Sequence, residues 1–155
     1  EVRRSFLQTH AETDNLLTYP DESKMTVDEE AGFLQKTADS ENAVELCAVV
    51  DGKLVGTAGV EPIGAREKLR LRAEFGISIE KAYWGQGIGR ALTAACISIA
   101  GEAGYAQLEL QVVADNAAAV ALYKSMGFTE YGRNPLGFRS RTTGWQSLLL
   151  MRLEL

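Results

Sequence analysis

The chain has 155 residues, of which 46% are hydrophobic and 24% are charged, and its formal net charge is −5 at pH 7. This length suits one domain with its own core, so residues 1–155 are predicted to form a single domain. The acidic balance, without a run of Lys and Arg, argues against a nucleic-acid partner. No apolar run approaches the roughly 20 residues that cross a bilayer, which argues against a membrane partner.

The chain has one histidine, His10, and two cysteines, Cys47 and Cys96. A single histidine excludes a zinc cluster built from histidines and argues against a Ser-His-Asp triad, so no metal site is expected. Each cysteine lies inside an apolar run, which favours a small core side chain over a disulfide. The expected location is therefore the reducing cytoplasm.

The first part of the chain is predicted to form two helices joined by a polar connection. Residues 2–10 are typical of a helix, and residues 11–25 form the connection. Thr26 and Glu29 form a capping box, after which apolar residues recur at helical spacing to Ala38. The acidic side chains of the connection are Glu12, Asp14, Asp21 and Glu22.

The middle of the chain is predicted to form three strands. Residues 44–50 and 54–60 alternate around Asp51-Gly52, a strong hairpin signal. A charged turn at residues 65–68 precedes a strand over residues 69–80. These strands lead directly into the most informative segment of the sequence.

That segment is a glycine-rich loop between a strand and a helix, Gly85-Gln86-Gly87-Ile88-Gly89-Arg90. The helix it opens is expected to end at about Ala100. Glycines let the backbone approach a ligand closely, and the first N–H groups of a helix have no partner within the helix. The loop therefore predicts an anion site made of main chain, suited to a phosphate or pyrophosphate. The alternative is a glycine-rich turn that only lets helix and strand pack closely.

Two familiar phosphate loops do not match this segment. A dinucleotide fingerprint needs a third glycine where the chain has Arg90 or Leu92, and a Walker loop needs Gly-Lys-Ser/Thr. These mismatches disfavour a nucleotide-binding α/β domain.

A second motif follows one helix and one strand later. Residues 108–113 alternate as a strand, and Asp115-Asn116 is a cap signal for a short helix over residues 117–126. Gly127 suits the position just after a helix end. A final pair of strands is expected at residues 128–133 and 144–153, with a mobile loop at residues 134–143.

The string Asn116-x-x-Ala119-x-x-Leu122-Tyr123-x-x-x-Gly127-Phe128, together with the glycine loop, resembles the GCN5-related N-acetyltransferase (GNAT) superfamily. The resemblance implies a mixed α/β (α+β) fold with a central splayed sheet of about six to seven strands and about four helices. The strand with which the family fold begins is not expected within residues 1–155, so either it lies on residues outside this sequence or the sheet forms without it. Trp84 is a departure, because the family usually has Gln or Arg there; a large aromatic could cover the adenine side of the groove or cap the core.

The resemblance also implies a set of cofactor-binding residues. Acetyl-CoA (coenzyme A) would lie along the strand and the glycine loop, with the Ile79 amide near the thioester oxygen. Tyr123 is the implied acid for the departing thiolate, since a phenol with a pKa of about 10 is protonated at neutral pH. The implied set is Ile77, Ser78, Ile79, Gly85, Gln86, Gly87, Ile88, Gly89, Arg90, Asn116 and Tyr123. Ile77, Ile79 and Tyr123 could equally be core residues, and Asn116 could be only a helix cap.

The general base is left open by the sequence. Glu74 and Glu80 lie on the strand that leads to the loop, and strand alternation places both opposite Ile77 and Ile79. Glu74 is the first candidate, Glu80 the second, and deprotonation through water the third. The acidic connection could form an acceptor wall near the first two helices or simply be a solvated loop.

The implied function is transfer of an acetyl group from acetyl-CoA to a primary amine in a ternary complex. The alternative is an acyl-CoA-binding sensor or interaction module without turnover. The acceptor, a small molecule or a peptide, is not identified, and a homodimer stays among the candidates. Parallel pairing should be lost beyond Ile79 and Val113, which would leave a deep groove beside Ile79.

Overall fold

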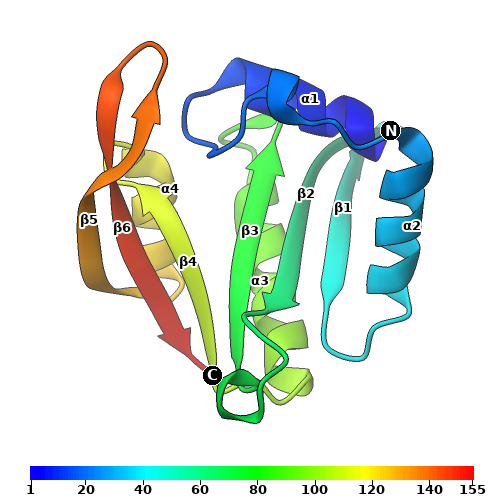
Figure 1. Cartoon of the computed structure of the whole chain (residues 1–155), viewed down its shortest axis with the longest axis vertical. Helices are drawn as coiled ribbons and strands as arrows, with labels where there is room; N and C mark the ends of the chain where they lie inside the picture. Colours follow the sequence, from blue (N-terminus) through cyan, green and yellow to red (C-terminus); the bar gives the residue numbers. More distant parts are fainter.

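The computed structural model describes residues 1–155 and contains one mixed sheet of six strands in the order β1-β2-β3-β4-β6-β5 (Figure 1). The strands are β1 (Val44–Val50), β2 (Lys53–Pro62), β3 (Arg72–Ile79), β4 (Gln107–Val113), β5 (Thr129–Ser140) and β6 (Gly144–Glu154). The helices are α1 (Val2–Glu12), α2 (Val27–Ala38), α3 (Ile88–Glu102) and α4 (Ala117–Ser125), with short 3₁₀ turns η1 (Pro20–Glu22), η2 (Glu67–Leu69) and η3 (Lys81–Tyr83). None of the helices has the length and apolar character needed to cross a membrane.

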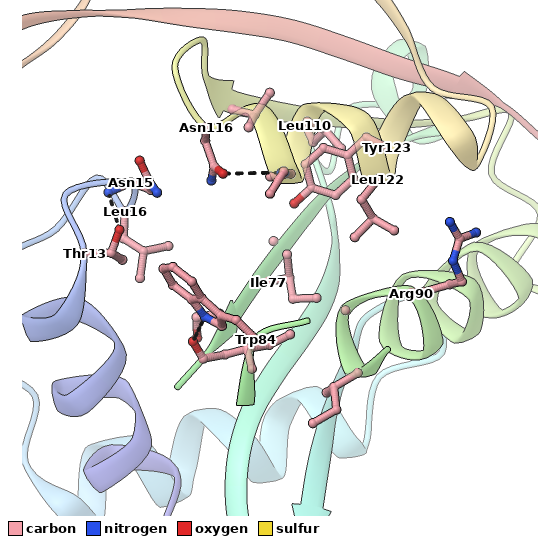
Figure 2. A pocket seen from close by; sticks show the side chains of 18 of the residues that line it. Thr13, Asn15, Leu16, Ile77, Trp84, Arg90, Leu110, Asn116, Leu122 and Tyr123 are labelled. Atoms are coloured by element: carbon pink, nitrogen blue, oxygen red, sulfur yellow. Dashed lines mark hydrogen bonds between the residues drawn. The ribbon is translucent and has the colours of Figure 1, made fainter. Parts of the chain in front are cut away.

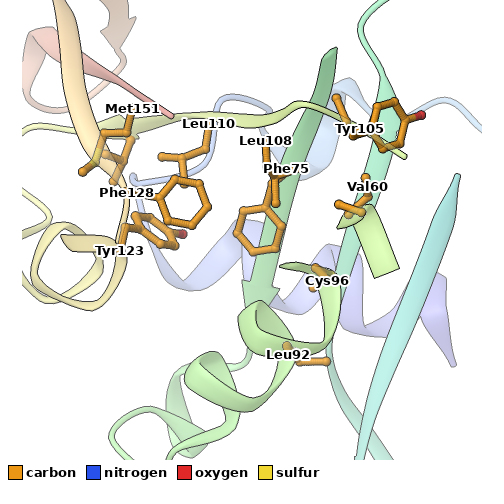
Figure 3. Packing of buried hydrophobic residues seen from close by; sticks show 14 of the residues in the cluster. Val60, Phe75, Leu92, Cys96, Tyr105, Leu108, Leu110, Tyr123, Phe128 and Met151 are labelled. Carbon is orange, nitrogen blue, oxygen red and sulfur yellow. The ribbon is translucent and has the colours of Figure 1, made fainter. Parts of the chain in front are cut away.

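Three of the four helices, α1, α2 and α3, are arranged around the half of the sheet that contains β1, β2 and β3. Helix α3 packs against all three strands, α1 contacts β2 and β3, and α2 contacts β1. Figure 1 shows α1 crossing the upper ends of these strands, where β3 ends. The buried core lies where α3 and α4 meet the sheet, and Figure 3 shows Phe75, Tyr123 and Phe128 packed together there.

The local signals in the sequence produce the expected caps and turns. The Thr26 side chain accepts from the Glu29 N–H, and the Glu29 carboxylate accepts from the Thr26 N–H. Asp51 and Gly52 have φ angles of 49° and 77°, as a tight turn between β1 and β2 requires. The hairpin and the capping box predicted from the sequence are therefore confirmed.

The sheet opens between β3 and β4. Parallel pairing covers only Arg72–Glu74 against Gln107–Glu109, so the strands separate earlier than the expected point near Ile79 and Val113. Strand β3 pairs with β2 along its whole length, and the Glu80 N–H donates to the Val55 carbonyl at 2.9 Å. Because backbone groups alternate along a strand, those of Ile77 and Ile79 point away from β2 and into the opening.

Two sequence-based expectations are wrong. Residues 134–143 were expected to be a mobile loop, but β5 continues to Ser140 and pairs with β6. A register irregularity between Asn134 and Phe138 accommodates the proline and glycine of this segment. The glycine is needed there, because a Cβ at Gly137 would lie 2.5 Å from the Leu148 Cγ.

The second correction concerns the cysteines. Cys96 is fully buried in the core as expected, whereas Cys47 is exposed. Leu46 and Ala48 pack against the core, so the side chain between them points to the opposite face of β1. An uninterrupted apolar run does not reveal which of its residues face solvent.

Candidate active site

A cavity of about 520 Å³ occupies the opening between β3 and β4 (Figure 2). Its lining comes from β3, the glycine loop, β4, α4 and the connection after α1. The groove expected beside Ile79 is therefore present. The sequence-predicted residues that line it are Ile77, Ser78, Ile79, Gly85, Gly87, Ile88, Gly89, Arg90, Asn116 and Tyr123. Gln86 and Glu74 do not line it.

The glycine loop presents unpaired main-chain donors to the cavity. Gly85 and Gly87 have φ angles of 73° and 85°, a left-handed conformation that favours glycine. The first N–H of α3 with a helical partner is that of Ala91, which donates to the Gly87 carbonyl at 3.0 Å. The N–H groups of residues 85–90 have no backbone acceptor, so this end of the cavity can bind an anion.

Helices α3 and α4 approach each other closely at this end. A Cβ on Gly89 would lie 3.3 Å from the Leu122 Cδ2, so glycine permits the close packing. The Arg90 Nη2 donates to the Ser125 Oγ at 2.9 Å and links the two helices. The Gln86 side chain instead donates to the Ala82 carbonyl at 3.1 Å, which explains why it does not line the cavity.

The free edge of β3 forms one wall of the cavity. The backbone groups of Ile77 and Ile79 face the opening, and the Trp84 Nε1 donates to the Ile79 carbonyl at 2.7 Å. This hydrogen bond occupies only the Ile79 carbonyl, so the Ile79 N–H stays a free donor beside the cavity. Trp84 itself lines the cavity and is 45% exposed, so it does not cap the core.

Tyr123 is buried among aromatic side chains but reaches the cavity. Its ring meets Phe75 edge-on at a centroid distance of 6.1 Å. Burial raises the pKa of Tyr123 to about 12, so the hydroxyl stays protonated across the physiological range. Figure 2 shows this hydroxyl directed into the cavity, where it is free to donate to a ligand.

Asn116 combines the two roles considered for it. Its side-chain oxygen accepts from the Ala119 N–H at 3.3 Å and so caps α4. The residue also lines the cavity, and Figure 2 shows it at the start of α4. Capping holds the side chain in a defined position at the cavity wall.

The two candidate bases lie in different surroundings. Glu80 is 2% exposed and forms ion pairs with Arg4 and Lys53, each at 2.6 Å. Burial alone would raise the pKa of Glu80, but hydrogen bonds and charges from Lys53 and Arg4 outweigh it and lower the pKa. Glu80 is therefore held ionised in a structural ion-pair network.

Glu74 is exposed on β3, opposite Glu61 on β2 and Glu109 on β4. Strand alternation places its side chain on the same face as Gly76 and Ser78, which line the cavity. Because Glu74 itself does not line the cavity, a proton could reach it from the cavity only through water.

The acidic residues of the connection do not line the cavity. Asp14 accepts hydrogen bonds from the hydroxyls of Ser140, Thr142 and Thr143. Asp21 pairs with Arg141 at 2.9 Å. Glu12 accepts from the Lys81 N–H, and Glu22 accepts from the Tyr19 N–H, each at 2.7 Å.

Neighbouring uncharged residues of the connection line the cavity instead. These are Thr13, Asn15, Leu16 and Leu17. Nothing in their local sequence marks them as site residues, because only the path of the chain after α1 brings them to the cavity.

Comparison with known proteins identifies relatives of the chain. Residues 7–128 match the model of the Acetyltransferase (GNAT) family. The chain is 40% identical over 83 residues to the [ribosomal protein bS18]-alanine N-acetyltransferase of Escherichia coli. The aligned region covers 52% of this chain and 54% of that enzyme. Across three curated relatives the match spans 28%, 22% and 54% of their lengths.

Solved structures agree over nearly the whole chain. An acetyltransferase of the GNAT family from Streptococcus pneumoniae superposes with a TM-score of 0.92 at 28% identity, covering 99% of this chain and 94% of that chain. The protein yncA from Salmonella typhimurium, solved with its cofactor acetyl-CoA, has a TM-score of 0.86 at 20% identity over 99% of this chain and 86% of its own. The family model covers most of the chain and the expected fold is confirmed, so this chain belongs to the Acetyltransferase (GNAT) family.

Proposed function

We propose that this chain is an N-acetyltransferase that uses acetyl-CoA and acetylates a primary amine by direct transfer in a ternary complex. The observation that carries the proposal is one cavity at which three features meet: the free N–H groups of the glycine loop, the free edge of β3, and the Tyr123 hydroxyl. The name of the Escherichia coli relative and the acetyl-CoA of the Salmonella structure support the reaction class.

The residues at the α3 end of the cavity fit the phosphates of coenzyme A. Six successive N–H groups from Gly85 to Arg90 have no backbone acceptor, and the positive end of the α3 dipole points the same way. Arg90 adds the only formal positive charge of the lining. Both features would offset the negative net charge of the chain at the place where a polyanion must bind.

The residues in the middle of the cavity fit a thioester. Acetyl-CoA, when bound, supplies the acetyl group as a thioester. The Ile79 N–H would donate to a carbonyl oxygen on which charge develops, as preorganised main-chain donors do in acyl transfer. The Tyr123 hydroxyl would donate its proton to the leaving sulfur, and its raised pKa keeps that proton available.

The amine must also lose a proton. No carboxylate lines the cavity, so the proton would leave through water. Glu74 lies on the face of β3 that carries Gly76 and Ser78, and we assign it as the group that takes the proton at the far end of this path. The buried ion pairs of Glu80 argue against an exchange of protons there.

The test compares two glycine substitutions, one at each end of helix α3. Gly87→Glu places a side chain and a negative charge in the anion site, so acetyl-CoA affinity measured by calorimetry should be lost. Gly104→Glu is the matched control: Gly104 lies just beyond α3 with φ +81°, and a Cβ there would meet no atom within 4 Å, as at Gly87. The control variant should bind normally.

Release of free thiol from acetyl-CoA should then be measured with a panel of amines. Near-normal affinity in Gly87→Glu would contradict the loop assignment. Tight acetyl-CoA binding with no amine-dependent thiol release would instead favour the acyl-CoA-binding module.

A further inference from the structure

The end of the cavity farthest from the anion site is uncharged. Of the 24 residues that line the whole cavity, 14 are hydrophobic, and Arg90 is the only one with a formal charge at neutral pH. Figure 2 shows Arg90 on one side of the cavity and Thr13 and Leu16 on the opposite side. The end near the connection is the acceptor end, if the anion site holds the phosphates.

Carboxylates are present near this end but are engaged elsewhere. Glu12 and Asp14 flank Thr13 in sequence, yet both accept hydrogen bonds from groups outside the cavity and neither lines it. A positive charge also lies beside this end, because the Lys81 Nζ is 5.9 Å from the centroid of the Trp84 ring. A second cationic group on an acceptor would therefore find no counter-charge in the lining.

Trp84 is the largest side chain that lines the cavity, and its ring lies between the middle of the cavity and the acceptor end. Its indole is held by the hydrogen bond from Nε1 to the Ile79 carbonyl at 2.7 Å. Figure 2 shows the ring between Leu16 and Ile77, with its surface toward the cavity. Trp84 is 45% exposed, and because the only polar atom of its side chain is hydrogen-bonded, the ring offers apolar surface that a ligand can cover.

We infer that Trp84 and Leu16 form an apolar acceptor subsite that selects a primary amine whose neighbouring group is uncharged and apolar, and that disfavours polyamines. The inference rests on the proposed acetyl transfer and names the substrate class for it. The apolar group gains by covering Trp84 and Leu16. A second ammonium in the same place would lose its hydration without gaining a carboxylate partner.

The first experiment compares two acceptors with the same six-carbon chain, hexylamine and 1,6-diaminohexane, at saturating acetyl-CoA. We expect kcat/KM for hexylamine to be roughly tenfold higher or more, a ratio within reach of one apolar or polar contact in a pocket. If neither amine turns over, their Kd values for the protein saturated with coenzyme A give the same comparison. Equal values, or a preference for the diamine, would overturn the inference.

The second experiment changes the subsite. Trp84→Ala should raise the KM for hexylamine by roughly tenfold and leave kcat little changed, while Trp84→Phe should retain most of the affinity. Trp145→Ala is the matched control, because Trp145 is 57% exposed on β6 and does not line the cavity. An unchanged KM in Trp84→Ala would remove Trp84 from the subsite.

A third variant supplies the missing counter-charge. Leu16→Glu should shift the preference toward 1,6-diaminohexane, and an unchanged ratio would contradict the inference. Calorimetry with acetyl-CoA distinguishes failure of the proposed function from failure of the acceptor subsite. If the unmodified chain does not bind acetyl-CoA, the proposed function is refuted. If it binds acetyl-CoA but prefers the diamine as acceptor, only the acceptor subsite is refuted.

Discussion

At the scale of single residues, Tyr123 combines a buried ring with a hydroxyl that reaches the cavity. Its ring packs against Phe75 and Phe128, with centroid distances of 6.1 and 5.8 Å, and this packing fixes where the hydroxyl points. The same burial keeps the phenol neutral by raising its pKa to about 12. A residue that is part of the core thus delivers a proton donor to the cavity.

Tyr123→Phe should lower kcat by roughly 10²-fold with little change in acetyl-CoA affinity, because it removes only the proton donor. With a pKa of about 12, Tyr123 should also cause no alkaline decline of kcat below about pH 11. Tyr105→Phe is the control: that hydroxyl donates to the Asn42 carbonyl at 2.6 Å outside the cavity, so its loss should cost about 1 kcal/mol of stability and leave kcat intact. Unchanged kcat in Tyr123→Phe would assign the residue to the core alone.

Glu74→Gln keeps the size of the side chain and removes its charge. If Glu74 takes the amine proton through water, kcat/KM should fall and the acidic limb of its pH profile should shift or vanish. Wild-type activity and an unaltered profile would eliminate Glu74 and favour release of the proton to bulk water. Steady-state rates measured across the pH range decide between these outcomes.

At the scale of elements, hydrogen bonds and one stacked ring hold the connection after α1 against the turn between β5 and β6. These contacts are called the clamp below. Asp14 holds the hydroxyls of Ser140, Thr142 and Thr143, and the Tyr19 hydroxyl accepts from the Arg141 N–H at 2.7 Å. The Arg141 guanidinium also stacks on the Tyr19 ring at 4.0 Å. The acceptor end of the cavity is therefore shaped by two segments more than 100 residues apart in the sequence.

Asp14→Asn should weaken this clamp and raise the KM for the acceptor by roughly 3- to 10-fold, since hydrogen bonds to a charged group contribute about 1.5–3 kcal/mol. The hydrogen bond from Ser140 is the main cause of the lowered pKa of Asp14. Because the folded-state pKa is lowered, the contribution of the clamp to stability is present at neutral pH and is lost as the pH falls through that pKa.

Asp21→Asn provides the comparison. It breaks an exposed ion pair with Arg141, in which the side chains are 66% and 56% exposed, and such pairs contribute about 0–1 kcal/mol. We expect little change in the acceptor KM. Equal effects of the two variants, measured with the same acceptor at saturating acetyl-CoA, would show that Asp14 has no special role in positioning the connection.

At the scale of the whole molecule, the sheet consists of two well-paired halves joined over three residues of each strand. Strand β3 is paired with β2 and β4 is paired with β6 over their lengths, so each half keeps its own hydrogen bonds where β3 and β4 separate after Glu74 and Glu109. The free backbone groups of β3 would each cost about 1–3 kcal/mol without water or a ligand. A ligand in the cavity would satisfy them, which couples binding to the integrity of the sheet.

The net charge and the site act on different stages of binding. A net charge of −5 attracts a cationic amine toward the molecule, but the cavity lining has no carboxylate to recognise a second positive charge. Attraction at long range and selection at the subsite are thus separate. Only the second depends on the positions of individual side chains.

The sequence by itself determined the features that depend on neighbours along the chain. The glycine loop, the capping box, the Asp51-Gly52 turn and the Asn116 cap each arise from residues within a few positions of one another. With the motif around Tyr123, they were sufficient to predict the family, the sheet and ten of the 24 residues that line the cavity.

Only the tertiary structure decided which side chains reach the cavity from elsewhere and which do not. The ionised Glu80 is paired with Arg4 and Lys53, which lie 76 and 27 residues away. Two acids of the connection, Asp14 and Asp21, contact the β5–β6 turn. The hydrogen bond that orients Trp84 depends on a carbonyl left free where β3 and β4 separate. These outcomes depend on long-range contacts, because a charge or an aromatic ring takes its role from the partner that folding brings to it.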